Sequence, residues 1–219
     1  MDTKTRILSV FLALAIGVAF PAAQTQRSPD TLAKELQARY QSIRDFSADF
    51  VQSYRAGVLK TRTSESGTVA VKKPGKMRWT YTKPERKEFG SDGRQMYWYV
   101  PEDKEVRVWD ATAQANTPDL FLSGRGDIAR DFTPTYVDAT IPGTVALKLV
   151  PRRSEPEYEY LVLALDPAKL QIRGLTSRDH QGGESAITFS NIKENRGLSD
   201  NDFVFKIPGG VTVVSDTAR

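Results

Sequence analysis

The chain has 219 residues, of which 39% are hydrophobic and 10% aromatic, and it carries a formal net charge of +4. This length and composition fit one sizeable folded domain and exclude disorder as the main state. With no cysteine and a single histidine, the chain lacks the groups for thiolate catalysis, disulfides, iron–sulfur clusters, cysteine-ligated zinc or a histidine cluster. The composition therefore favours a protein that binds something over an enzyme.

The first residues have the pattern of an export signal. Lys4 and Arg6 precede an uncharged apolar run at residues 7–20, and the small residues Ala22 and Ala23 follow. The run is short for a bilayer span, so we expect a cleavable secretory signal peptide over residues 1–23 instead of a transmembrane anchor or a buried helix. Residues 24–219 are expected to form a single domain, without a cysteine for lipid attachment at the mature N-terminus.

A helix is predicted near the start of the mature chain. Ser28 can cap its N-terminus, and Pro29 suits the first helical position. The following apolar residues recur at spacings of four, four and three, which places them on one stripe that must pack against another surface: Leu32, Leu36, Tyr40 and Ile43.

From Asp45 onward, apolar and polar residues alternate strictly, which is typical of half-buried antiparallel strands. Turn sequences such as Pro74-Gly75, Asp92-Gly93 and Pro101-Glu102-Asp103 separate these segments, so consecutive hairpins are predicted. About ten or eleven strands result, centred on residues 46–51, 68–72, 76–81, 96–100, 106–109, 145–150, 158–165, 171–177, 186–191, 203–206 and 211–214.

The middle of the chain interrupts this alternation. Thr117-Pro118-Asp119 can cap a short helix at residues 120–122, and residues 127–132 can form another helical turn. The sequence therefore predicts a mainly β protein with some α structure, in which one large curved antiparallel sheet carries helices on one face.

No catalytic constellation stands out in the sequence. There is no G-x-S-x-G or H-E-x-x-H motif and no glycine-rich phosphate loop. Asp179 and His180 lie near Ser177 and Ser185, but Gly182-Gly183 predicts a hairpin turn that leaves His180 on the surface. We therefore expect no catalytic residue, no metal site and no cofactor.

Large apolar side chains are concentrated at alternating strand positions. They form either a core fully covered by the helices or a partly filled concave face that a movable lid closes over a cavity. Composition alone leaves both interpretations open. The residues concerned are Phe46, Phe50, Met77, Trp79, Tyr81, Met96 and Trp98.

A basic cluster lies between Lys72 and Lys87, where seven lysines and arginines face only Glu85. Such a cluster forms either solvated hairpin turns or a docking surface for an acidic partner or a membrane.

Four stretches, in this order behind a signal peptide, resemble the LolA family of periplasmic outer-membrane lipoprotein carriers. Each stretch alone is weak, but the ordered set spans essentially the whole mature chain. They are DFVQ at 49–52, GTVAVKKPGKMRW at 67–79, SDGRQMYWYVP at 91–101 and FVFKIPGGV at 203–211.

The resemblance implies a half-open, incomplete antiparallel β-barrel of about eleven strands covered by a helical lid. It also implies a monomeric periplasmic carrier that takes acylated lipoproteins from an inner-membrane lipoprotein-releasing ABC transporter to an outer-membrane acceptor lipoprotein, with no nucleic-acid partner. The alternative is a related periplasmic lipid-binding or sensor module of the same fold.

The resemblance also suggests roles for individual residues. The family usually has an arginine before the proline of the first hairpin, where it holds the lid closed; here that position is Lys73, which keeps the charge but lacks the planar fork of donors. The lid helix is expected at Leu120, Phe121 and Leu122. The acyl-chain cavity is expected to be lined by Phe46, Phe50, Met77, Trp79, Met96 and Trp98.

Overall fold

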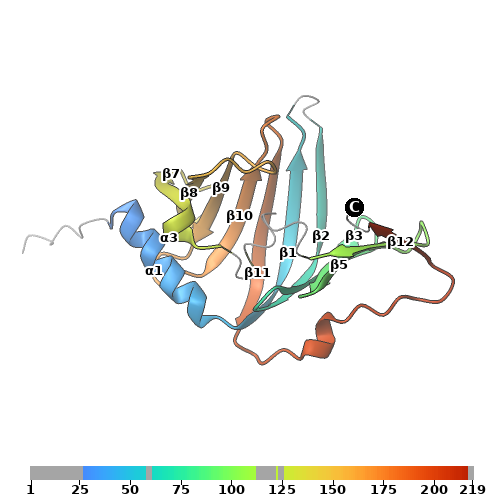
Figure 1. The fold of residues 1–219 in the computed structure, drawn as a ribbon. Coiled ribbons are helices and arrows are strands. Elements are labelled where there is room, and N and C mark those ends of the chain that lie inside the picture. The colour runs from blue at the N-terminus through green and yellow to red at the C-terminus, as the bar shows by residue number, and fades with distance from the viewer. Residues whose placement is uncertain (1–26, 58–60, 112–121, 123–125, 217–219) are drawn as a thin grey trace, which may run out of the picture.

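The computed structural model describes residues 27–57, 61–111, 122 and 126–216, which form one strongly curved sheet with a helix across one side (Figure 1). The predicted signal peptide at residues 1–23 lies outside the described residues, and so do Leu120 and Phe121 of the predicted lid helix. Within the described ranges, no helix is long and apolar enough to cross a membrane.

Twelve strands of the described chain form a single sheet in the order β12-β6-β5-β4-β3-β2-β1-β11-β10-β9-β8-β7. Its edge strands, β7 and β12, do not pair with each other, which confirms the half-open barrel. The strands are β1 Asp45–Arg55, β2 Arg62–Lys72, β3 Lys76–Lys83, β4 Lys87–Asp92, β5 Gln95–Val100, β6 Glu105–Asp110, β7 Phe132–Val137, β8 Val145–Pro151, β9 Tyr160–Leu165, β10 Ile172–Arg178, β11 Glu184–Glu194 and β12 Thr212–Asp216.

The sheet consists of two antiparallel meanders. Strands β1 to β6 form the first and β7 to β11 the second, as the predicted series of hairpins requires. Antiparallel pairing of β1 with β11 joins them along a register that runs from Phe46 opposite Glu194 to Arg55 opposite Glu184. This seam makes one continuous surface from two distant parts of the chain.

Helix α1, Pro29–Ser42, begins and packs as the sequence predicts. The Ser28 side chain accepts a hydrogen bond from the Thr31 N–H at 3.2 Å, and Pro29 occupies the first turn. The apolar stripe is buried against the sheet together with Ile43, just beyond the helix. A second predicted turn is present as α3, Ile128–Asp131, which packs beside α1 and is capped by Asp127.

The main core lies between α1 and the concave face of the sheet. Because cross-strand partners share a face, the strand register groups its residues into rows. One row is Phe46, Val71, Met77, Ser91, Met96 and Trp109, and the next is Ala48, Val69, Trp79, Phe89 and Trp98. These rows contain five of the six residues expected to line a cavity. The sixth, Phe50, lies two positions beyond Ala48 on β1 and therefore on the same face.

The expectation of a strand at residues 203–206 is wrong. Residues Asp200–Phe203 form a short 3-10 helix, η1, because the Ser199 and Asp202 side chains cap each other's backbone N–H groups. Phe203 is fully buried. The last predicted strand does form, as β12, but it pairs parallel with β6, so the sheet is not wholly antiparallel.

The sequence pattern did not predict two of the strands, β4 and β7. Strand β4 has the sequence KEFGSD, in which charges and a glycine mask the alternation. Gly90 is needed there because a Cβ atom would lie 2.5 Å from the Tyr97 hydroxyl oxygen. Strand β7 contains Pro134, which cannot donate to a ladder and is tolerated because β7 is an edge strand.

Residues 195–211, here called the crossover, run along the outside of the sheet from β11 to β12 (Figure 1). The buried Asp45 carboxylate accepts two backbone N–H bonds from its first residues, at 2.7 and 3.1 Å. Farther along, Asp200 forms ion pairs with Lys72 at 2.6 Å and Lys76 at 2.7 Å. Charged groups thus fasten the crossover to β1, β2 and β3.

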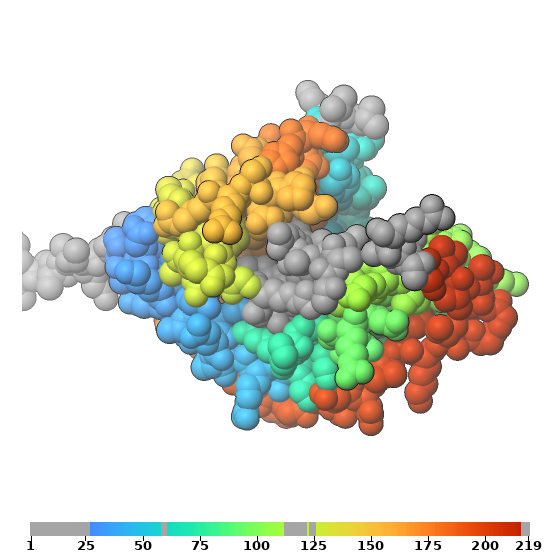
Figure 2. All heavy atoms as spheres, in the orientation of Figure 1, coloured from blue at the N-terminus to red at the C-terminus, as the bar shows by residue number. Residues whose placement is uncertain are grey.

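Apolar contacts hold the second half of the crossover against the sheet. The Phe205 ring stacks on Tyr97 with 4.2 Å between centroids, and Phe203 and Val106 are fully buried. Tyr97 alternates with Met96 and Trp98 and so lies on the opposite, convex face. The red C-terminal residues accordingly lie against the green residues of β5 and β6 (Figure 2). The sheet therefore has a small second core outside the first.

We expect Asp200→Asn to weaken the crossover in a pH-dependent way. Lys72 and Lys76 lower the pKa of the Asp200 carboxyl to about 2, so its stabilising effect is present near neutral pH and is lost as the pH falls towards 2. Urea unfolding midpoints of wild type and variant should differ at pH 7 and converge at low pH. Substitution of the exposed Asp103 by Asn is the control; a constant difference across pH would contradict the role of this ion pair.

Candidate functional site

Lys73 links the first hairpin to the helix that covers the core. Its ammonium group donates a hydrogen bond to the main-chain carbonyl of Tyr40 and lies 3.3 Å from the centroid of the Tyr40 ring. The cation thereby meets both a carbonyl at the C-terminal end of α1, where the helix dipole favours positive charge, and an aromatic face. The position expected to hold the lid is therefore occupied by a lysine that does contact the helix.

Tyr40 extends this contact to the middle of the chain. Its hydroxyl donates a hydrogen bond to the main-chain carbonyl of Leu122, the described residue of the predicted lid helix, whose side chain is buried. Burial raises the pKa of the Tyr40 hydroxyl, which keeps it protonated and able to donate. Lys73, Tyr40 and Leu122 form a polar chain, here called the latch, over an otherwise apolar interior.

A small, partly open cavity lies behind the latch, between the C-terminal half of α1 and strands β1, β10 and β11. Its volume of about 20 Å³ admits roughly one water molecule, so this part of the core is nearly full. The lining is mainly apolar and consists of Arg39, Tyr40, Ile43, Phe46, Leu122, Leu170, Ile172, Phe189, Ile192 and Glu194.

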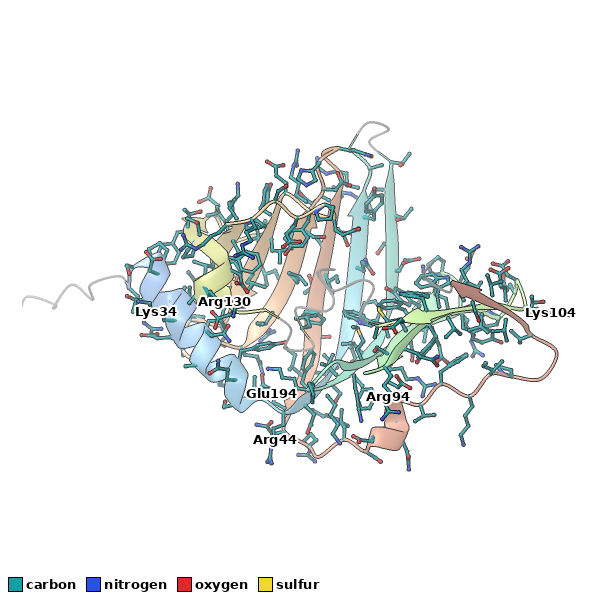
Figure 3. The ribbon with its side chains drawn as sticks, viewed as in Figure 1. Lys34, Arg44, Arg94, Lys104, Arg130 and Glu194 are labelled. Carbon is teal, nitrogen blue, oxygen red and sulfur yellow. The ribbon has the colours of Figure 1, made fainter. Side chains whose placement is uncertain are left out.

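One end of the cavity is closed by charged groups. Arg39 on α1 pairs with Glu194 at the end of β11 with 2.7 Å between nitrogen and oxygen, and Gln171 donates to the same carboxylate at 3.2 Å. Figure 3 shows Glu194 beside the lower end of α1. Each partner is about a quarter exposed, and this pair is therefore a second polar contact between α1 and the sheet.

The residues expected to line the acyl-chain cavity are gathered in the same core. Phe46, Phe50, Met77, Trp79 and Met96 are buried, and Phe46 borders the cavity itself. Trp98 is half-buried, with its ring 6.4 Å from Tyr81 and 6.0 Å from Phe89. Their role as a ligand wall stays a prediction.

Sequence reasoning missed the part of the cavity wall on the second meander. Phe189 and Ile172 are examples, and their alternating pattern predicted strands but no site. The missing information was the pairing of β1 with β11, which brings Phe189 opposite Phe50. Hydrophobic alternation identifies a buried face, but it does not say which distant strand shares that face.

The basic cluster is largely neutralised within the protein. Lys72 and Lys76 pair with Asp200, Arg78 pairs with Glu88 at 2.9 Å, and Lys87 pairs with Glu65 at 2.5 Å. With Lys73 in the latch, five of the seven basic residues have structural roles. This favours hairpin turns over a docking surface as the interpretation of the cluster.

His180 lies exposed in the β10–β11 turn, and its Nε2 is 2.7 Å from the Glu155 carbonyl oxygen. No group of three or more histidine, aspartate or glutamate side chains in the described ranges is arranged to hold a metal ion.

Fold and site together define a class: half-open β-barrels whose apolar interior is closed by a helix held through polar contacts. The family described as "Outer membrane lipoprotein carrier protein LolA" matches residues 41–206, and the chain therefore belongs to the LolA family. This confirms the resemblance of the four sequence stretches. Members of the family are carriers and not enzymes.

The chain is similar to curated proteins along almost its whole length. It is 30% identical over 207 residues to the "Outer-membrane lipoprotein carrier protein" of Chromohalobacter salexigens, covering 93% of this chain and 96% of that one. The protein of the same name from Methylococcus capsulatus is 31% identical over 196 residues, covering 89% and 91%.

Among solved structures, an uncharacterized conserved protein from Thermus thermophilus has a TM-score of 0.55 and 15% identity. The match covers 84% of this chain and 98% of that one, and it supports the fold alone.

We expect Lys73 to make the free energy of unfolding increase with pH in the alkaline range. Burial lowers the pKa of the Lys73 ammonium from 10.5 to about 8. A group whose pKa falls on folding contributes stability that is complete above its unfolded pKa and is lost as the pH falls through its folded pKa. Wild type should therefore gain stability relative to Lys73→Arg as the pH rises from about 8 to about 10, because arginine stays charged.

Urea unfolding midpoints of both proteins, measured at half-unit pH steps over that interval, test this expectation. Stability curves that stay parallel would show that the Lys73 amine is not buried by the closed helix.

Proposed function

We propose that this protein is a periplasmic carrier that encloses the acyl chains of lipoproteins beneath α1 and the lid segment. The observation that carries the proposal is the latch, because a few polar contacts close an apolar interior. The names of the relatives, outer-membrane lipoprotein carrier proteins, support the cargo class.

The cost of exposing lipid to water explains the need for such a carrier. At about 0.8 kcal/mol per methylene, one sixteen-carbon chain represents roughly 12 kcal/mol of avoided hydration. An acylated protein therefore does not cross an aqueous compartment unescorted. The carrier must offer an apolar interior comparable to the membrane that the cargo leaves.

Loading then becomes an exchange of one apolar cover for another. In the closed state, α1 supplies Leu32, Leu36 and Tyr40 to the core. An entering acyl chain replaces them as the cover of the concave face, beginning at the cavity that Tyr40 and Phe46 line. Because apolar surface replaces apolar surface, the net energy of loading is small and transfer in both directions is feasible.

The finer elements of this proposal concern route and boundaries. The carrier receives lipoproteins from an inner-membrane lipoprotein-releasing ABC transporter and delivers them to an outer-membrane acceptor lipoprotein as a monomer. Residues 1–23 act as the signal peptide and residues 24–219 as the carrier domain. Lys73 is the lid latch, and Leu120, Phe121 and Leu122 belong to the lid.

Release of a triacylated lipoprotein from proteoliposomes that contain the transporter tests the function. The mature protein should recover the lipoprotein in a soluble, equimolar complex. Failure to solubilise any lipoprotein would contradict the proposal. Native mass spectrometry of the purified protein provides the second arm, since copurified diacylglycerol-type lipid without lipoprotein would favour the lipid-binding or sensor module.

We expect Lys73→Leu to uncouple binding from delivery. Without the ammonium group, the Tyr40 carbonyl loses its charged donor and the closed empty state becomes less stable, so cargo remains bound. Transfer to acceptor-containing membranes should fall several-fold, while the yield of the lipoprotein complex stays near that of wild type. Lys73→Arg, which keeps the charge, is the matched control. Normal transfer by Lys73→Leu would contradict the role of Lys73 in holding the lid closed.

A further inference from the structure

Four buried side-chain atoms in the described part of the chain have no hydrogen-bond partner: Trp79 Nε1, Trp109 Nε1, Tyr97 Oη and Arg173 Nε. Two of the four are indole nitrogens on the concave face of the sheet. An indole N–H can only donate, so each needs an acceptor that the closed protein does not supply.

Trp79 lies in the wall directly behind the cavity. It is 1% exposed, and the Phe50 ring packs edge-on against it with 4.9 Å between centroids. Its other aromatic neighbour, Phe189, lies 6.2 Å away and lines the cavity itself. The unpaired donor of Trp79 is therefore one layer from the space beneath α1.

Trp109 carries the second unpaired donor on the same face. It pairs in register with Met96, and its ring stacks on Phe89 with 6.4 Å between centroids. Phe89 is in turn the cross-strand partner of Trp79. The two indoles thus flank Phe89 from strands β3 and β6.

An unpaired buried N–H is costly, and phenylalanine would fill an aromatic position without that cost. The two buried polar residues Ser91 and Asp45 are satisfied: Ser91 accepts a bond from the Gly93 N–H at 3.0 Å, and Asp45 accepts two from the crossover. The two indoles are therefore exceptions to the pairing seen at these buried polar positions. A ligand that enters the core can supply the missing acceptor.

We propose that the indole N–H groups of Trp79 and Trp109 form an acceptor-reading site on the concave face, behind the residues that line the cavity, which binds the carbonyl oxygens of acyl chains that enter the core. This inference rests on the proposed function and adds the chemical class that the wall selects. A purely apolar wall disfavours an acyl carbonyl, because burial removes its hydrogen bonds to water. A dry N–H donor restores one such bond and so favours a chain with an ester or amide carbonyl.

Synthetic lipopeptides that differ only in the linkage test this site. The first probe is a fluorescein-labelled peptide whose N-terminal cysteine carries two palmitoyl esters on glycerol, and the second carries hexadecyl ethers at the same positions. A third probe carries one amide-linked palmitoyl chain and separates amide from ester carbonyls. Fluorescence polarisation with the mature protein gives the dissociation constants.

Two substitutions of Trp79 remove the donor. Trp79→Phe keeps an aromatic ring, and replacement by 3-benzothienylalanine keeps the bicyclic shape without the N–H. Tyr97→Phe is the matched control, because it removes a buried, unpaired donor that lies on the opposite, convex face. The benzothienyl variant should unfold at the same urea concentration as wild type, since no hydrogen bond is lost.

Wild type and Tyr97→Phe should bind the ester probe about fivefold more tightly than the ether probe, the ratio expected of one additional hydrogen bond in a dry wall. The benzothienyl variant should show a smaller preference, because only the Trp109 donor remains. Equal binding of both probes by wild type, or a preference unchanged in the variant, would overturn the acceptor-reading site while leaving the carrier function intact. Failure of wild type to bind any probe would instead count against the carrier function.

Discussion

The constraint on which the rest of the structure depends is the apolar concave face of the curved sheet. Rows of large side chains such as Met77, Trp79 and Met96 cannot remain in water, so some cover must always lie on them. In the closed protein that cover includes α1, whose buried stripe packs against this same face. Helix and sheet therefore stabilise each other through this shared apolar surface.

The energetic roles of the contacts are divided between two kinds of group. Apolar burial supplies most of the stability. It does not favour one covering element over another, because hydrophobic contact is not directional. Polar groups at the edges, namely the latch and the Arg39–Glu194 pair, define the closed position of α1. On the convex face, the crossover is held by charges and a separate small core, so the outer framework does not depend on what fills the inside.

Local structure was predictable from the sequence, and long-range pairing was not. Ser28, Pro29 and the helical stripe identified α1, and alternation with turn sequences identified most strands, because these signals act within a few residues. Gly90 and Pro134 hid β4 and β7, since their positions make sense only beside particular neighbours. The parallel course of β12 and the contribution of Phe189 to the site arise from the crossover and the β1–β11 seam, which no local pattern specifies. Lys73 was identified through family resemblance, whereas its contact with the Tyr40 ring required coordinates.

The seam between β1 and β11 also has a consequence for biosynthesis. These strands are separated by most of the domain, and α1 packs against α3 and β7, which lie well downstream. During export the N-terminal segment emerges with its apolar stripe long before its docking surface exists. Closure of the fold must therefore wait until β11 is available, so the chain exposes apolar surface and is prone to aggregation until its last strands are present.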